Sequence, residues 1–244
     1  MTDKKTFSFS RLSSWDTCKH SWNRIYNLND RGEDNWFSRY GTLAHEIFEK
    51  IDLGQLDPKD GYSEWSSRYQ AEVLLGEDRH EVDWMDKWKA EGDAFFKTFT
   101  GGRTKAIWVE KHIVIEREGY TFQGYVDRMS QLPNMDYMIT DYKCSNIYEG
   151  EELKKKARQL YLYSIGVNRE FGEFPKKLMF YHFRKKAPVV IPFNKEDFKE
   201  AWDWADRTVA EIEAYEGNYP MQDNKFFCTA ICNFRNSCTK QFEI

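Results

Sequence analysis

An aspartate and a lysine end an apolar stretch of the sequence, MDYMITDYKCSN, that runs from Met135 to Asn146. These two residues are Asp141 and Lys143. Residues two apart on a β-strand point to the same face, so both side chains emerge together at the tip of an otherwise apolar strand. A carboxylate in such a place can bind a metal ion, and a lysine beside it can stabilise charge that develops on a phosphate.

A second carboxylate, Asp127, lies fourteen residues before Asp141, in the stretch GYVDRM. A turn at Pro133-Asn134 separates the two, and antiparallel pairing across this turn brings the carboxylates close together. They repel each other unless a cation lies between them, and hard oxygen ligands suit Mg²⁺ or Mn²⁺. Exposed strand-end acids paired with Lys143 would explain the same pattern, because Asp-x-Lys also occurs elsewhere in this charged chain.

Hydrophobic periodicity predicts the elements that must position these residues. Helices are expected over about 10–26, 41–53, 63–75, 82–99, 151–167 and 194–217, with Ser10 and Asn194 as caps of the first and last. Strands are expected in AIWVEKHIVIER, YTFQGYVDRMSQL and MDYMITDYK, which form a meander with a hairpin turn at Glu118-Gly119, and then in KKLMFYHF and PVVIPF. This order predicts an α/β fold, a small mixed β-sheet flanked by helices on both faces.

The composition fits one globular domain over residues 1–244, with a core at about 40–220. Apolar residues make up 41% of the chain and aromatic residues 17%, and the sequence has neither a membrane-spanning run nor a signal-peptide pattern. We therefore expect a cytoplasmic protein with no membrane contact. With a net charge of −4, a nucleic-acid-binding protein must rely on metal ions or on local basic runs such as KKKAR, Lys154 to Arg158.

Four short motifs resemble, in order, those of the PD-(D/E)XK nuclease superfamily in its RecB-like branch. They are GTLAHEIFEK with His45, GYVDRM with Asp127, TDYK with Asp141 and Lys143, and RQLYLY with Gln159 and Tyr163. The opening FSFSRLSSWDTCKHSWNRIY is also similar to the N-terminal segment of that branch. Each motif alone is weak, but together they are fairly specific, and the resemblance spans about Phe7 to Cys238.

The resemblance implies a restriction-endonuclease-like nuclease core and a role for each motif residue. It implies that His45, Asp127 and Asp141 bind Mg²⁺ or Mn²⁺, and that Asp127, Asp141 and Lys143 are catalytic. Gln159 and Tyr163 share a helix face, since they are four residues apart, and would hold the nucleic acid together with Lys155 and Arg158 of the basic run. Without the resemblance, a lone helical histidine and a Gln-Tyr pair would be ordinary structural residues. Glu110 could also approach the site, but no motif fixes its place.

Three of the five cysteines, Cys228, Cys232 and Cys238, fall within eleven residues, and Cys18 could supply a fourth ligand. Four thiolates can hold a [4Fe–4S] cluster or a zinc ion. The resemblance favours the cluster, formed by Cys18 and the segment 226–240, because CRISPR adaptation nucleases and AddB-type nuclease domains have this arrangement. The first gap here is three residues where the family usually has two. Cys144 is left over as a small buried residue.

These features together predict a metal-dependent DNA exonuclease that acts on single-stranded DNA or DNA ends. Recombination, repair or phage DNA metabolism in a bacterial or phage-infected cell is the expected context. The sequence contains no Gly-x-x-x-x-Gly-Lys-(Ser/Thr), so unwinding would need a helicase or recombination partner. The alternative is an iron-sulfur-stabilised DNA-binding or adaptor module with little or no nuclease activity.

Overall fold

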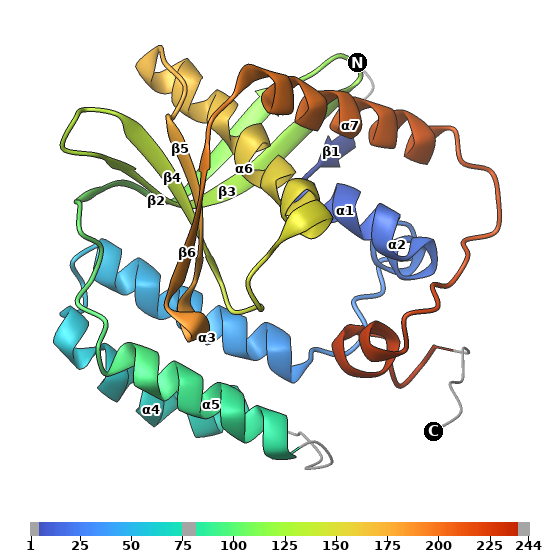
Figure 1. The fold of residues 1–244 in the computed structure, drawn as a ribbon. Coiled ribbons are helices and arrows are strands. Elements are labelled where there is room, and N and C mark those ends of the chain that lie inside the picture. Colours follow the sequence, from blue (N-terminus) through green and yellow to red (C-terminus); the bar gives the residue numbers. More distant parts are fainter. Residues whose placement is uncertain (1–4, 75–81, 239–244) are drawn as a thin grey trace.

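A six-stranded mixed sheet with helices on both faces organises the computed structural model, which describes residues 5–74 and 82–238 (Figure 1). The strands are β1 (Lys5–Phe7), β2 (Ala106–Glu116), β3 (Tyr120–Gln131), β4 (Tyr137–Lys143), β5 (Lys177–His182) and β6 (Ala187–Pro192). The helices are α1 (Phe9–Thr17), α2 (Lys19–Tyr26), α3 (Trp36–Asp52), α4 (Gly61–Glu72), α5 (Val82–Phe96), α6 (Gly150–Phe171) and α7 (Lys195–Glu213), with short turns η1 (Pro58–Asp60), η2 (Phe183–Lys185) and η3 (Phe227–Ile231). The predicted fold class is confirmed.

Strand β3 is the longest strand and pairs along both of its edges. Strand β2 runs antiparallel along one edge. On the other edge, β4 pairs antiparallel over Arg128–Gln131 and β1 pairs parallel over Tyr120–Phe122. Strand β5 then joins β4 in parallel through the crossover helix α6, and β6 returns antiparallel. The predicted meander is therefore confirmed, and β4 leaves β3 at Arg128.

Two aromatic-rich cores lie on opposite faces of this sheet (Figure 1). Helices α1, α6 and α7 cover one face, where Phe122 and Leu160 are fully buried. Helices α3, α4 and α5 cover the other, where the Tyr142 ring of β4 stacks on Phe48 of α3 with centroids 4.1 Å apart. No helix in the described ranges is long and apolar enough to cross a membrane.

The first predicted helix is two helices, and its expected cap is wrong. Helix α1 begins at Phe9 because the Ser8 side chain, not that of Ser10, accepts a hydrogen bond from a first-turn amide. The backbone of Cys18 is extended, with φ −158° and ψ 105°, so the helix breaks there and α2 follows. This break places Cys18 at a junction between helices and not in the middle of one.

Other element boundaries follow from capping and from tertiary pairing. Helix α3 begins at Trp36, earlier than predicted, because the Asn35 side chain accepts from the Ser38 amide. The predicted Asn194 cap of α7 is confirmed. Strand β1 was not predicted, since its three residues gain strand geometry only from pairing with β3. The end of the helix expected over 63–75 and the last residues of the segment 226–240 lie outside the described residues.

A buried ion pair docks the C-terminal end of α3 against the sheet. The Arg128 side chain, 4% exposed, donates to Asp52, 7% exposed, with Nε 3.0 Å from Oδ1. Arg128 also donates to the carbonyl of Thr104, and the Tyr142 hydroxyl donates to the second Asp52 oxygen at 3.1 Å. The carboxylate is therefore fully engaged, as a buried charge must be.

We predict that Asp52→Ala lowers the free energy of unfolding by about 3–5 kcal/mol, because it leaves Arg128 buried without its counter-charge. Asp203→Ala, which removes an exposed i,i+4 partner of Lys199, should cost no more than about 0.5 kcal/mol. Urea unfolding of both variants measures the difference. Equal losses in the two variants would show that the buried pair does not hold α3 in place.

Candidate active site

The candidate site lies where β3 and β4 diverge. The last described ladder pair before this point is Arg128 with Thr140. Beyond it, the Asp127 carboxylate accepts a hydrogen bond from the backbone amide of Tyr142, with Oδ2 2.8 Å from the nitrogen. A side chain thus takes the place of a ladder partner. Asp127 lies inside β3 and Asp141 lies near the end of β4, so the two carboxylates are on neighbouring strands.

Glu110 of β2 joins this site from the opposite edge of β3. Ligand atoms of His45, Glu110 and Asp127 all lie within 4.8 Å of one another. Glu110 has φ +45°, a left-handed conformation that is unfavourable for a residue with a side chain, and the regular pairing of β2 with β3 skips it. Strain of this kind in a strand is tolerated where it places a functional group.

No motif identified Glu110, but the hairpin turn contains a signal for it. Glu110 and Asp127 are each eight residues from the turn at Glu118-Gly119, so a regular hairpin places them opposite each other. Counting outward from a turn therefore finds a cross-strand carboxylate that motif matching passes over.

His45 presents its Nδ1 atom to the carboxylates. Its Nε2 lies 2.9 Å from the carbonyl oxygen of Tyr142, which can only accept, so Nε2 carries the hydrogen. Burial lowers the pKa of His45 below its ordinary value, which favours the neutral ring. The Nδ1 lone pair then faces Asp127 Oδ2 at 3.4 Å. Two acceptors at this distance require a proton or a cation between them.

The carboxylates of the candidate site outnumber the positively charged side chains beside them. Burial, and then the Asp141 charge, raise the pKa of Asp127 well above its ordinary value. Burial and Asp127 raise the pKa of Glu110 to about 7. Burial alone would lower the pKa of Lys143, but the Asp141 carboxylate outweighs it, so the net pKa of Lys143 lies above its ordinary value. Two carboxylates and an imidazole in an acidic site form a donor set for a divalent cation.

Asp141 lies beside the three grouped donors, paired with Lys143. Lys143 Nζ is 2.6 Å from Asp141 Oδ2, and Asp141 is 2% exposed. The structure therefore brings His45 and Asp127 of the predicted ligand set together with Glu110. A role for Asp141 as a metal ligand stays a prediction.

Gln159 and Tyr163 of α6 lie against Lys143. Lys143 Nζ donates to Gln159 Oε1 at 3.3 Å, and Gln159 Nε2 donates to the Tyr163 hydroxyl at 3.2 Å. The Tyr163 ring packs on Gly124, where an added Cβ would come within 2.4 Å of it. The glycine of GYVDRM is therefore what admits the tyrosine of the helix motif.

The two basic residues predicted beside them are placed differently. Lys155 is exposed on α6. Arg158 is engaged with α7, since it donates to both oxygens of Glu200 at 2.6 and 3.1 Å and its guanidinium lies 4.9 Å from the Trp204 ring centroid. The structure does not bring either of them into the group around Lys143.

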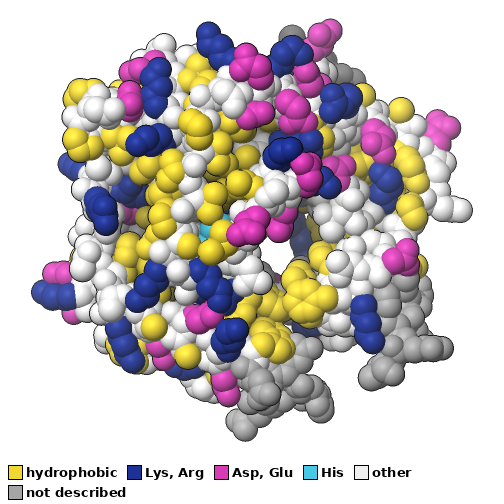
Figure 2. Space-filling model, in the orientation of Figure 1, with side chains coloured by type: hydrophobic (Ala, Val, Ile, Leu, Met, Phe, Trp, Pro, Cys, Tyr) yellow, Lys and Arg dark blue, Asp and Glu magenta, His cyan; other side chains and the backbone are white. Residues whose placement is uncertain are grey.

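A groove of about 440 Å³ opens the three donors to the surface. It is lined by Phe37, Ser38, Gly41, Thr42, His45, Glu46, Glu49 and Glu110. Small residues at Gly41 and Thr42, one turn before His45 on α3, leave this approach open. On the face shown in Figure 2, acidic and basic side chains are interspersed and form no broad basic surface.

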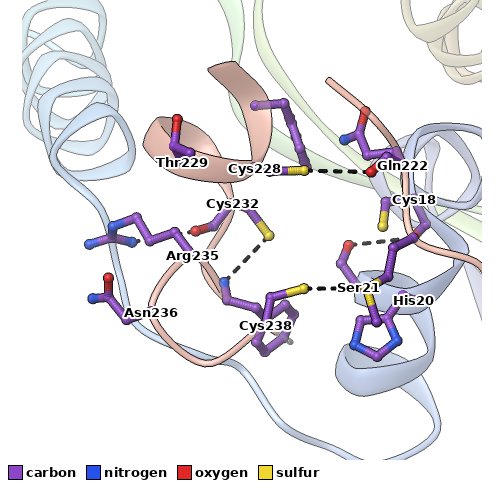
Figure 3. Close-up of a pocket in the computed structure, with 13 residues that line it drawn as sticks. Cys18, His20, Ser21, Gln222, Cys228, Thr229, Cys232, Arg235, Asn236 and Cys238 are labelled. Atoms are coloured by element: carbon purple, nitrogen blue, oxygen red, sulfur yellow. Dashed lines mark hydrogen bonds between the residues drawn. The ribbon is translucent and has the colours of Figure 1, made fainter. Parts of the chain in front are cut away.

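The other candidate site is a cavity of about 480 Å³ between α2 and the C-terminal segment (Figure 3). All four cysteines predicted to act together line it: Cys18, Cys228, Cys232 and Cys238. Among the described residues, no three cysteine sulfurs lie within 4.8 Å of one another, so the thiols surround the cavity without closing it. Cys232 Sγ accepts from the Phe234 amide at 3.4 Å, and burial raises the pKa of its thiol.

Sequence comparison places the chain among known nucleases. The profile of the PD-(D/E)XK nuclease superfamily matches residues 6–239. An ATP-dependent helicase/nuclease subunit of Clostridium perfringens strain SM101 is 24% identical over 190 residues, which covers 67% of this chain. Its counterparts in strains 13 and ATCC 13124 give the same values. This chain spans only 15% of the length of these relatives.

Structural comparison identifies a shared fold. A Eubacterium rectale protein, assigned provisionally as an exonuclease, superposes with a TM-score of 0.52 over 99% of this chain and 92% of its own. The sequence identity is 14%, so this likeness concerns the fold alone.

We predict a crossover in the stability of Glu110→Gln relative to the wild type. The raised pKa means that ionisation of Glu110 destabilises the metal-free protein as the pH rises from about 4.5 to about 7. In EDTA at pH 8, Glu110→Gln should therefore melt at a higher temperature than the wild type. With Mn²⁺ at pH 8 the order should reverse, because the variant lacks a ligand, and the wild-type gain should be smaller at pH 6, where a proton must be displaced.

Glu49→Gln is the matched control, since Glu49 lines the same groove outside the group of three. Thermal unfolding of the three proteins with EDTA or Mn²⁺ at both pH values measures the effect. A Glu110→Gln variant that gains as much from Mn²⁺ as the wild type would contradict the assignment of Glu110 as a ligand.

Proposed function

Because the chain belongs to the PD-(D/E)XK nuclease superfamily, we propose that it is a Mg²⁺- or Mn²⁺-dependent DNA exonuclease, a phosphodiester hydrolase that acts on single-stranded DNA or DNA ends. The observation that carries this proposal is the convergence of His45, Glu110 and Asp127 beside Asp141 and Lys143. A module that only bound DNA would have no need to gather these acids where burial, and then their mutual repulsion, raise their pKa values.

Each residue has a distinct role in the proposed reaction. His45, Glu110 and Asp127 hold the ion, with Asp141 within reach of the same site. A bound divalent ion supplies an activated water and a Lewis acid for the phosphate. Lys143 stays protonated at neutral pH and stabilises the charge that develops on the phosphate oxygens. Gln159 accepts from Lys143 and so fixes the direction of its ammonium group.

The preference for ends and single strands rests on the RecB-like character of the motifs. The curated relatives combine a helicase and a nuclease in name, and this chain matches only a small part of them. Because these relatives join the two activities in name, we propose that a helicase or recombination partner supplies unwound DNA. DNA recombination, repair or phage DNA metabolism in the cytoplasm is the proposed context.

We propose further that the cysteine cavity holds a [4Fe–4S] cluster through Cys18, Cys228, Cys232 and Cys238. The support for a group held by four thiolates is that all four cysteines line one cavity. The Phe234 amide beside Cys232 provides a hydrogen bond to sulfur of the kind that tunes such clusters.

Incubation of anaerobically purified protein with end-labelled single- and double-stranded DNA tests the nuclease function. The wild type should degrade DNA with Mg²⁺ or Mn²⁺ but not with EDTA, and the product ladder gives polarity and strand preference. Lys143→Ala should lower the rate constant by about 10²-fold or more, since it removes a cation aimed at the transition state. Lys199→Ala, an exposed lysine of α7, should cut like the wild type. A folded, metal-loaded wild type that cuts neither substrate would leave only the DNA-binding or adaptor function.

Removal of one cysteine tests the cluster. Wild-type protein should contain about four iron atoms per chain and show visible absorbance, whereas Cys18→Ser should lose most of the iron and melt at a lower temperature. Cys144→Ser, which alters the one cysteine outside the cavity, should keep its iron. Elemental analysis of iron and zinc distinguishes the outcomes, and one zinc per chain without iron would overturn the cluster.

A further inference from the structure

Lys156 of α6 is a half-buried cation that the proposed mechanism does not use. Its Nζ lies 5.8 Å from the ring centroid of Tyr148, which is buried between β4 and α6. Within the described ranges no carboxylate forms an ion pair with it. Glu152, one turn earlier on the helix, is exposed and makes only a weak contribution to its electrostatic environment. A cation that is partly desolvated without a counter-charge is available to bind an anion.

Lys156 differs in this respect from the other basic residues of the run KKKAR. Lys154 pairs with Glu151 at 2.6 Å on the exposed side of the helix. Arg158 pairs with an acid of α7. Lys155 is exposed. The run is therefore not a uniform basic patch, because only one of its members is half-buried and, among the described residues, unpaired.

The position of Lys156 on α6 directs it toward the catalytic lysine. Lys156, Gln159 and Tyr163 are spaced at i, i+3 and i+7, which places them on one face of the helix. Gln159 accepts a hydrogen bond from Lys143, so this face is turned to the site. Burial, and then repulsion from Lys143, lower the pKa of Lys156, which agrees with two ammonium groups at close quarters.

We propose that Lys156 binds the non-reacting DNA phosphate next to the scissile one. Lys143 is already paired with Asp141, whereas Lys156 has no such partner in the described part of the chain, so a second phosphate of the same strand supplies the missing charge. Lysine binds phosphate as a point charge without requiring a fixed fork geometry. This inference rests on the proposed nuclease function, and it makes Lys156 a positioning residue that sets the register of the strand along α6.

The test compares Lys156→Met with Lys199→Met, a change at an exposed lysine of α7, because methionine keeps the apolar stem and removes the charge. The probe is a fluorescent single-stranded oligonucleotide, titrated in EDTA over a series of salt concentrations. Loss of one charged contact should raise Kd about tenfold and reduce the slope of log K against log salt by about 0.7. Lys199→Met should leave both nearly unchanged, and Lys156→Arg should restore most of the binding.

Steady-state cleavage with Mn²⁺ gives a second readout. A contact to a phosphate that does not react is the same in the ground and transition states, so Lys156→Met should raise KM and leave kcat unchanged. A purely structural role predicts instead a lower melting temperature with an unchanged salt slope. If Lys156→Met and Lys199→Met bind alike while the wild type cuts DNA, the inference is overturned and the nuclease function stands. If the wild type cuts nothing but Lys156→Met still weakens binding, the nuclease function falls and the phosphate contact stands.

Discussion

The peptide backbone of Tyr142 holds two candidate metal ligands at once. Its amide donates to Asp127 and its carbonyl accepts from His45, while its own neighbours in the chain are Asp141 and Lys143. The side chain is fixed as well, because the ring stacks on Phe48 and the hydroxyl reaches Asp52. The aromatic core between the sheet and α3 therefore sets the geometry of the site, because packing fixes the residues that hold the candidate ligands in place.

This arrangement gathers unfavourable features at one place in the fold. Glu110 adopts a left-handed conformation, and burial raises the pKa values of Glu110 and Asp127. Each of these destabilises the metal-free protein, and the surrounding structure must offset them. The buried pair of Arg128 with Asp52, one residue along from Asp127, contributes part of that support. Arg128, which stabilises the fold, and Asp127, a candidate ligand, are thus adjacent in sequence, but the two tasks are carried by different side chains.

Much of this could be predicted from the sequence, because turns and alternation determine register. The meander follows from two turns, and it brings Asp127 and Asp141 together. The helix break at Cys18 could not be predicted from periodicity, since the apolar spacing continues through it.

The basic run was predicted to act through Lys155 and Arg158, whereas helical spacing from Gln159 points to Lys156. Charge counts alone do not tell which face of a helix a lysine occupies, and ion pairs such as that of Arg158 with Glu200 appear only in three dimensions.

Asn35 connects the cysteine segment to the active site. Its side-chain oxygen caps α3 by accepting from the Ser38 amide, and its side-chain nitrogen donates to the carbonyl of Ile231 at 2.7 Å. Ile231 lies between Cys228 and Cys232, and α3 carries His45. An N-cap contributes about 1 kcal/mol to a helix, and here its orientation depends on a partner in the cysteine segment. A group that orders this segment therefore also orders the N-terminal end of the helix that presents His45, so the two sites are physically coupled although no ligand is shared between them.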